Sequence, residues 1–341
     1  MTISIVLPYY NAAPFLADCL NSIAAQTWTD FELLAINDGS DDSGPAIVND
    51  FARRDRRCTA LDIQHSGIVA ALNTGINAAA GDLIVRMDAD DIMHPRRLEM
   101  LVEFSRGLPA DFIVGSRVQS EIPEGADDRL QRYLDWSNSL LTSAALRNEL
   151  FVDATIVHPT MCFPRRTILL LGAYREVDWP EDYDLLQRAV HAGLPLFKLS
   201  DVLLVKKDHG KSLSRLDARY HRSAMLKAKA HFLLKQEEVQ NRPMTIIGGG
   251  GVARELAGFL GELGRPPHLF VDSKQQSGAR TIMGVEAVGI DVAQPANTLA
   301  GPVREGHFFL LCIGNDRARQ AVEQTLNELN RRVWTDYLRI V

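Results

Sequence analysis

The sequence lacks an apolar run long enough to span a membrane, so we expect at most peripheral membrane contact. It also lacks a basic excess, and its net charge of −6 argues against a nucleic-acid partner. The first residues, Met1–Leu7, have no basic leader and read as a strand rather than a signal peptide. The cysteines show no paired spacing: they are Cys19, Cys58, Cys162 and Cys312. We expect these cysteines to be reduced and buried, which suits a protein of the cytoplasm. A location at the inner face of the membrane is a more specific possibility within that expectation.

The sequence does have a regular alternation of short apolar runs and amphipathic stretches. Buried strands are predicted at residues 3–7, 31–36, 59–63 and 83–87. Helices are predicted between them, over residues 14–25, 46–54 and 67–80. This alternation predicts an α/β fold with a mainly parallel, twisted sheet and helices on both faces. Right-handed crossovers would place the strand ends at Pro8, Asp38 and Asp88 along one edge.

Three carboxylates directly follow the fourth predicted strand: Asp88, Asp90 and Asp91. Ligands of open α/β sheets bind at the carboxyl ends of strands. Clustered carboxylates repel each other unless a cation neutralises them, and Mg²⁺ commonly joins one or two carboxylates to phosphate oxygens. The cluster therefore indicates a site for a metal ion and a diphosphate. Asp91 is expected to be structural, because no step of the chemistry requires it. A solvated acidic turn is the alternative.

The neighbouring strand ends carry groups that suit a nucleotide. The segment Pro8–Asn11 offers backbone groups and an aromatic platform that includes Tyr10. Asp38 could accept from the imide N–H of a uracil, Asp88 could hold a ribose hydroxyl, and Asp90 could hold the metal. Taken singly, each residue is explained at least as well by loop packing or by an Asx-turn.

Four stretches, in this order and spacing, resemble the family-2 glycosyltransferases of the GT-A fold. They are Ser4–Asn11, Ile36–Asp42, His65–Ile68 with Leu72–Gly75, and Arg86–Asp91 with His94–Leu98. The resemblance implies a nucleotide-diphosphate sugar donor (UDP-sugar favoured), a Mg²⁺ or Mn²⁺ ion, and inversion at the anomeric carbon. It assigns Asp38 to the base, Asp88 to the ribose, and Asp90 with Asp88 to the metal. The other donor-binding residues that it implies are Pro8, Tyr10, Asn11 and Asn73.

Further along, Pro180-Glu181-Asp182 begins a predicted helix, with acids where the helix dipole favours them. Stabilising that terminus is one explanation of these acids. The stretch is also similar to the acidic pair of the same family, which implies Asp182 as general base and Glu181 as its support. An inverting transfer is an in-line displacement, so a carboxylate must take the acceptor proton during attack. A glycosidase would need a second carboxylic acid.

The basic loop over residues 206–215 resembles the loop that ends the catalytic domain in this family, where a histidine approaches the metal or phosphates. His209 is the matching residue, and a solvated loop histidine is the alternative. The Gln-x-x-Arg-Trp motif and membrane helices of processive members are absent from the sequence, which favours transfer of a single sugar. The same resemblance implies that residues 121–150 form the part of the active site that binds a saccharide or lipid-linked acceptor.

We expect three parts in the chain: a catalytic domain over residues 1–215, a linker helix over 216–242 and a Rossmann-like domain over 243–341. A long helical pattern over residues 216–239 supports the linker. Oligomers could form through that helix or through the C-terminal domain. In that domain a predicted strand leads into a Gly-rich turn with Gly248 and Gly250, and Asp272 follows the next strand at the distance of a ribose-binding acid.

This last part resembles the small Rossmann-like domain at the start of sugar O-acyltransferases. The matching stretches are Ile247–Gly251, Val271–Asp272 and Ile313–Arg317. The acyltransferase repeat domain is absent, so acyl transfer is not implied. Three interpretations remain open: a nucleotide or sugar-nucleotide sensor, a NAD site, and a packing module without a ligand.

The sequence thus predicts an inverting, metal-dependent glycosyltransferase. A role in surface polysaccharide synthesis is implied by the family resemblance alone. An NAD-dependent sugar oxidoreductase is one alternative. It would need a catalytic Tyr-Lys or Cys/His set beside the Gly-rich turn, and the sequence shows none. A non-catalytic sugar-nucleotide-binding protein is the other, and the set Asp88, Asp90 and Asp182 argues against it.

Overall fold

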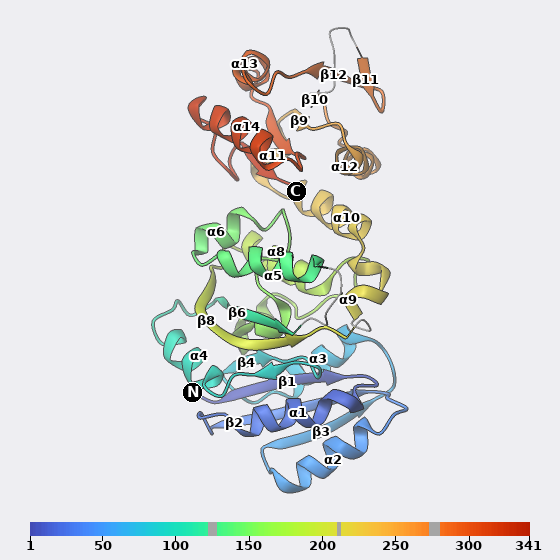
Figure 1. Ribbon diagram of the computed structural model, residues 1–341, viewed down its shortest axis with the longest axis vertical. Helices are drawn as coiled ribbons and strands as arrows, with labels where there is room; N and C mark the ends of the chain where they lie inside the picture. The colour runs from blue at the N-terminus through green and yellow to red at the C-terminus, as the bar shows by residue number, and fades with distance from the viewer. Residues whose placement is uncertain (122–127, 210–212, 273–279) are drawn as a thin grey trace. The chain divides into compact units, whose positions relative to one another are not determined.

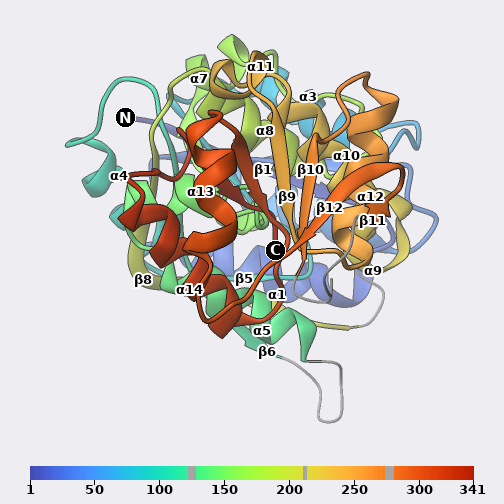
Figure 2. The same ribbon diagram turned by 90° about the horizontal axis from the view of Figure 1, so that it is seen from above.

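The computed structural model describes residues 1–121, 128–209, 213–272 and 280–341. The chain divides into two compact units. The first comprises Met1–Arg147, Ala154–Val177 and Glu181–Leu216, and the second comprises Asn148–Asp153, Asp178–Pro180 and Asp217–Val341. Each unit has its own sheet with helices packed on it (Figures 1 and 2). The α/β class predicted from the sequence is confirmed.

The first unit contains a mixed eight-stranded sheet of order β3-β2-β1-β4-β7-β6-β8-β5. The first four strands in this order are parallel, and so are β6 and β8, whereas β7 and β5 run antiparallel to their neighbours. The parallel half places the ends of β2, β1 and β4 side by side, as predicted. The strands are β1 (Ile3–Tyr9), β2 (Phe31–Asp38), β3 (Cys58–Ile63), β4 (Leu83–Arg86), β5 (Ile92–Met93), β6 (Ile113–Glu121), β7 (Cys162–Pro164) and β8 (Leu196–Lys207).

Helices cover both faces of the parallel half, because alternate residues of a strand point to opposite faces. One core joins Ile5 of β1 to Leu16 of α1 and Val48 of α2. Val6, the next residue of β1, faces Gly75 of α3 on the other side. The helices are α1 (Ala13–Ala24), α2 (Gly44–Arg54), α3 (Ile68–Ala78), α4 (Arg97–Ser105), α5 (Arg129–Ser139), α6 (Ser143–Asn148), α7 (Arg165–Leu170), α8 (Glu181–His191) and α9 (Leu213–Leu216), with the 3-10 turn η1 (His158–Thr160).

Gly75 lies where α3 comes closest to the sheet. A Cβ atom added there would lie 2.6 Å from Cγ1 of Val6 and 2.7 Å from Cδ1 of Ile36. We expect Gly75→Ala to lower the free energy of unfolding by about 1–3 kcal/mol, because the buried strands must move to admit the methyl group. Urea unfolding of the full chain measures this change.

Gly261→Ala is the matched control for this prediction. Gly261 lies in α12 (Gly251–Glu262), and a Cβ atom there would meet nothing within 4 Å. Alanine is the better helix former by about 1 kcal/mol, so this variant should be neutral or more stable. An equal loss of stability in both variants would contradict the packing described for α3.

The second unit contains a six-stranded sheet of order β11-β12-β10-β9-β13-β14, in which every neighbouring pair except β11 with β12 is parallel. Leu299 of α13 and Leu326 of α14 share one core with Phe309 of β13. The strands are β9 (Met244–Ile247), β10 (Leu269–Asp272), β11 (Arg280–Ile282), β12 (Val285–Gly289), β13 (Phe308–Leu311) and β14 (Tyr337–Arg339). The helices are α10 (Arg222–Leu233), α11 (Glu237–Gln240), α12, α13 (Ala296–Arg304) and α14 (Asp316–Glu328), with η2 (Ala218–Tyr220).

The segment Asn148–Asp153 belongs to the second unit, although it comes from the first half of the chain. Phe151 is fully buried and meets Trp334 edge-on, with the ring centroids 5.5 Å apart. Lys229 Nζ donates to the carbonyl oxygens of Val152 and Ile340 at 2.8 and 2.9 Å. The core of this unit therefore needs residues that are far apart in sequence.

The segment Asp178–Pro180 also belongs to the second unit. The Asp178 carboxylate pairs with Lys227 Nζ at 2.7 Å. The Trp179 ring lies 5.1 Å from the ring of His231, measured between centroids. This unit therefore contains α10 and chain segments that precede it.

The single long helix predicted over residues 216–239 is wrong. The structure has η2, α10 and α11 there, separated by extended residues at His221 and Gln236. Asp217 adds a further break where η2 begins, because its side chain accepts from the backbone N–H of Arg219 and offers the chain an alternative to helix. Among the residues that the structure describes, no helix has the length and apolar character needed to cross a membrane.

Candidate active site

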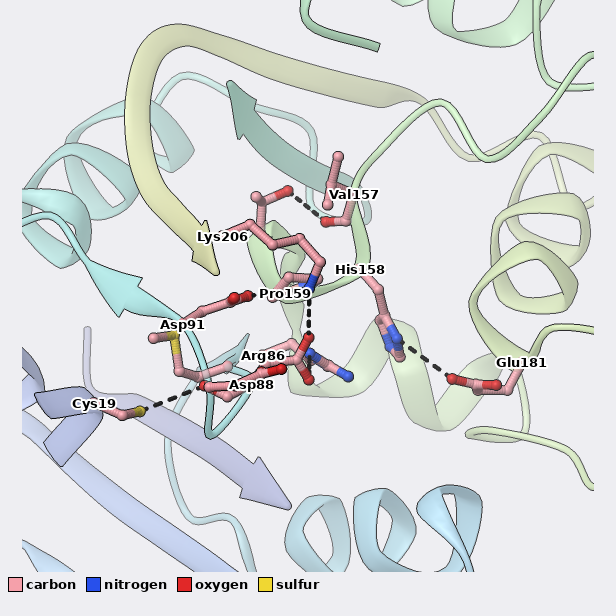
Figure 3. Close-up of polar contacts among 12 residues, drawn as sticks. Cys19, Arg86, Asp88, Asp91, Val157, His158, Pro159, Glu181 and Lys206 are labelled. Atoms are coloured by element: carbon pink, nitrogen blue, oxygen red, sulfur yellow. Dashed lines mark hydrogen bonds and ion pairs between the residues drawn. The ribbon is translucent and has the colours of Figure 1, made fainter. Parts of the chain in front are cut away.

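The acidic turn that carries Asp88, Asp90 and Asp91 lies between β4 and β5. One oxygen from each of the three carboxylates lies within 4.8 Å of the others. β5 pairs antiparallel with the end of β8, so Lys206 and His209 come to lie beside the turn (Figure 3 shows Lys206). The strand pairing thus gathers acidic and basic groups at the carboxyl end of β4.

Two buried side chains hold the backbone of the turn through hydrogen bonds. Arg97 is fully buried and its Nη2 donates to the carbonyl oxygens of Arg86 at 3.1 Å and Pro159 at 2.7 Å. The Cys19 thiol donates to the Asp88 carbonyl oxygen at 3.4 Å (Figure 3). Burial, together with the nearby carboxylates, raises the pKa of Cys19, so this thiol is neutral and structural.

Asp88 lies between two cations. Its carboxylate pairs with the buried Arg86 guanidinium and lies 3.5 Å from Lys206 Nζ (Figure 3). Burial alone would raise the pKa of Asp88, but the charges of Arg86 and Lys206 outweigh it and lower the pKa to about 2. Asp88 is therefore an anion at any physiological pH.

Asp91 is fully buried in the same cluster. Its Oδ1 accepts from the backbone N–H of Lys207 at 3.3 Å. Its Oδ2 lies 3.5 Å from Lys206 Nζ but has no hydrogen-bond partner among the described residues. Burial raises the pKa of Asp91 to about 7, against the opposing charge of Lys206. Asp91 therefore lies within the carboxylate cluster, and the structural role that the sequence suggested for it stays a prediction.

His209 lies beside Asp90 of the turn. Its Nε2 is 2.8 Å from Oδ2 of Asp90, and its ring stacks on Phe15 with the centroids 4.4 Å apart. The structure thus places the histidine beside the carboxylate that the sequence assigned to the metal. Its contact with metal or phosphate stays a prediction.

Asp38 ends β2 and is buried. Its carboxylate accepts from the backbone N–H groups of Ser66 at 2.7 Å and Gly67 at 3.0 Å, at the start of α3. Nδ1 of His65 lies 2.9 Å from both the carbonyl and a carboxylate oxygen of Asp38. The His65 ring stacks on Tyr10 at 4.2 Å, so a half-exposed aromatic surface lies next to this carboxylate. This arrangement suits a nucleobase, a role that stays a prediction.

The other predicted donor-binding residues fix the backbone around this edge. Pro8 is within β1, and Asn11 has a positive φ of 48° while its Oδ1 accepts from the N–H of Asp41. The amide of Asn73 is satisfied at both ends by the backbone of Tyr174, at 2.9 and 3.0 Å. These contacts are structural, and contact of Pro8, Asn11 and Asn73 with a nucleotide stays a prediction.

Glu181 begins α8 and is buried. Its Oε1 lies 3.5 Å from Nδ1 of His158, whose Nε2 lies 2.8 Å from the hydroxyl of Tyr174. Figure 3 shows His158 between Glu181 and the pair formed by Arg86 and Asp88. A buried histidine, which the sequence did not identify, thus lies between the start of α8 and the acidic turn.

Asp182, the next residue, is only partly buried. Its Oδ1 lies 2.7 Å from the backbone N of Tyr183. Its carboxylate is therefore in the first turn of α8, where the helix dipole favours the anion. This position suits a base that must reach a bound acceptor, and the role stays a prediction.

His158 gives the fold a pH dependence with a definite sign. Burial, and then the charge of Arg86, lower its pKa well below the unfolded value of 6.5. Below pH 6.5 the unfolded chain therefore binds a proton at this position that the folded chain refuses, so the contribution of His158 to stability falls as the pH falls. We expect His158→Gln to flatten this decline in urea unfolding measured between about pH 5 and pH 8. A decline as steep as in the wild type would contradict a neutral buried His158.

In the second unit, the Gly-rich turn and Asp272 lie together. Gly248 has a φ of +119°, and a Cβ atom there would lie 2.5 Å from the Cys312 carbonyl oxygen. A Cβ atom on Gly249 would lie 2.3 Å from Oδ2 of Asp272. Gly250 precedes α12 and has open space around it. The turn and the acid are adjacent, as in a dinucleotide site, and their binding of a nucleotide stays a prediction.

Comparison with solved structures identifies the fold of this chain. The crystal structure of residues 1–349 of TarS from S. aureus, in complex with UDP-GlcNAc, matches with a TM-score of 0.55 and 18% sequence identity. The match covers 76% of this chain and 72% of that chain. At this identity the likeness shows the fold alone, which is the GT-A fold predicted from the sequence.

Residues 4–170, which include the acidic turn, match the family Glycosyl transferase family 2. The uncharacterized glycosyltransferase EpsJ of Bacillus subtilis is 38% identical over 101 residues, which cover 30% of this chain and 29% of EpsJ. The amylovoran biosynthesis glycosyltransferase AmsE of Erwinia amylovora is 27% identical over 204 residues, which cover 59% of this chain and 74% of AmsE. The chain thus spans less than a third of EpsJ.

Proposed function

We propose that this protein transfers a single sugar from a nucleotide-diphosphate sugar to a hydroxyl group of a saccharide or lipid-linked acceptor. The observation that carries the proposal is the acidic turn, where three carboxylates lie within 4.8 Å at the end of β4 in a family-2 domain. In this proposal the nucleotide lies along the strand ends, with its base at Asp38 and Tyr10 and its ribose at Asp88. TarS binds UDP-GlcNAc, which supports a UDP-sugar as the first donor to test.

The carboxylates of Asp88, Asp90 and Asp91 would hold Mg²⁺ or Mn²⁺. The donor set fits a hard cation because it consists of carboxylate oxygens, and one of these, Oδ2 of Asp91, is buried without a hydrogen-bond partner among the described residues. When bound, the ion supplies positive charge that offsets the charge on the leaving diphosphate. The leaving group then needs no protonating carboxylic acid.

Asp182 is the proposed general base. In an inverting transfer the acceptor oxygen attacks the anomeric carbon from the face opposite the diphosphate, and the C–O bond to the diphosphate breaks as the new bond forms. The acceptor hydroxyl is far too weak an acid to ionise beforehand, so its proton passes to a carboxylate oxygen of Asp182 during attack. Glu181 and His158 form a buried contact behind this residue and would hold the start of α8 in position.

The proposal is tested by a screen of nucleotide sugars with the purified full chain and MnCl₂. We expect one donor to raise the thermal midpoint and to be turned over, either by transfer to a saccharide or by slow hydrolysis to the nucleoside diphosphate. Chromatographic detection of the nucleoside diphosphate measures turnover. A full panel of nucleotide sugars that neither binds nor reacts would overturn the proposal.

The proposed setting is the synthesis of a surface polysaccharide, at or near the inner face of a membrane. The name of AmsE, a relative in amylovoran biosynthesis, supports this setting. The second unit is proposed to bind a nucleotide at Gly248, Gly250 and Asp272, because the turn leaves room at Gly250 and the acid lies next to it. The same screen, extended to NAD and to the Asp272→Asn variant, tests that site.

A further inference from the structure

The acidic turn contains its own cations. Three carboxylates gather there, and besides His209 an arginine and a lysine face them: Arg86 pairs with Asp88, while Lys206 lies between Asp88 and Asp91. Asp88 and Asp91 therefore each have a cation of the chain itself beside them.

Lys206 is placed for this task by the end of β8. Its Nζ lies 3.5 Å from Oδ2 of Asp88 and 3.5 Å from Oδ2 of Asp91 (Figure 3 shows the three residues). Its side chain is only 17% exposed. The next residue, Lys207, points elsewhere, because its Nζ pairs with the exposed Asp18 at 3.1 Å. Of the two adjacent lysines, only Lys206 contributes its charge to the acidic turn.

We propose that Lys206 is a resident cation that shares the carboxylates of Asp88 and Asp91 with the divalent ion and so weakens the binding of that ion. The inference rests on the metal site of the proposed function. Oδ2 of Asp91 has no hydrogen bond among the described residues, so the ammonium group is the nearest charge that offsets it. An incoming divalent ion must share this oxygen with the ammonium group or displace it, and like charges at such range repel strongly.

Two consequences follow for the protein without metal and with it. The wild-type site is stable without a divalent ion, because Lys206 and Arg86 hold the carboxylates together. Removing the ammonium group leaves buried carboxylates with too little positive charge, which destabilises the fold but makes the site more attractive to a divalent ion.

The experiment compares the full-length wild type with Lys206→Met and with the control Lys207→Met. Methionine keeps the length and the apolar stem of the side chain and removes only the charge. The thermal midpoint is measured in EDTA and in increasing MnCl₂, and Mn²⁺ affinity is measured by calorimetry. We expect Lys206→Met to have the lowest midpoint in EDTA, the largest rise with MnCl₂, and an Mn²⁺ affinity at least about tenfold tighter than the wild type.

Lys207→Met should follow the wild type in each of these measurements. Equal Mn²⁺ affinity and equal midpoint shifts in all three proteins would overturn the proposal. If Lys206→Met does not fold in EDTA, it is prepared in MnCl₂: recovery of a folded protein supports the proposal, and failure to recover it overturns the proposal.

Sugar transfer by the wild type in the same buffers separates this inference from the proposed function. Transfer that is accompanied by equal Mn²⁺ affinities in wild type and Lys206→Met overturns only the role of Lys206. Absence of both transfer and Mn²⁺ binding overturns the proposed function, and the role of Lys206 with it.

Discussion

Asp182→Asn is expected to lower kcat by about 10²–10⁴-fold, the range that a positioned general base contributes. Asparagine has nearly the same shape but cannot take the acceptor proton. The affinity for the nucleotide sugar should stay close to that of the wild type, since the base acts on the acceptor. Steady-state kinetics give kcat, and calorimetry with the donor found in the screen gives the affinity.

Asp178→Asn is the matched control for this variant. Asp178 lies four residues earlier, and its side chain is 80% exposed and paired only with the half-exposed Lys227 among the contacts that the structure gives it. An exposed ion pair contributes little to stability, so this variant should keep its activity. A large loss of donor affinity in Asp182→Asn would mean that Asp182 binds the donor, and an unchanged kcat would exclude it as the base.

Asp90→Asn is expected to lower the rate of sugar transfer by about 10²–10⁴-fold, because a metal ion supplies several kcal/mol of charge stabilisation. The substitution removes one charged oxygen ligand from the cluster and leaves its shape intact. Mn²⁺ affinity, measured by calorimetry, should fall together with the rate. EDTA should reduce the wild-type rate to a similar level, and MnCl₂ should restore it.

Asp18→Asn is the control for a carboxylate that lies near the site but outside the cluster. Asp18 is 64% exposed and contacts Lys207 rather than the acidic turn. Its loss should leave both Mn²⁺ affinity and rate unchanged. Wild-type transfer that continues at full rate in EDTA would exclude the divalent ion from the reaction.

Much of the first unit could be predicted because its signals are local. β1, α1, β2 and α2 are encoded by alternating apolar runs and helical periodicity within about 50 residues, and the parallel order then places Asp38 and Asp88 at one edge. His209 was placed beside the metal site through resemblance. The structure brings it to 2.8 Å from Asp90, although its chemical role is still a prediction.

Lys206 and His158 could not be found in this way, because their neighbours come from distant strands. Lys207 and Asp91 are in contact although 116 residues separate them, and only the pairing of β5 with β8 brings the two segments together. The Lys206-Lys207 pair gave one usable signal: adjacent residues of a strand face opposite ways, so one of two lysines at a strand end must point inward.

The second unit was harder to predict, for a related reason. Hydrophobic periodicity revealed β9 and the Gly-rich turn but could not show that Asp217 interrupts the helical pattern before α10. Periodicity also could not assign Asn148–Asp153 to this unit, because an apolar pattern predicts that a segment is buried but not in which core.

That assignment has a consequence for how the chain matures in a cell. Glu149 pairs with Arg339, which follows it by 190 residues. At a synthesis rate of about 5–20 residues per second, the segment around Phe151 waits roughly 10–40 s for its final neighbours to leave the ribosome. During that interval the contacts of Phe151 with Trp334 and of Glu149 with Arg339 cannot form, so nascent chains stalled before residue 334 should depend on chaperones more than the released protein does.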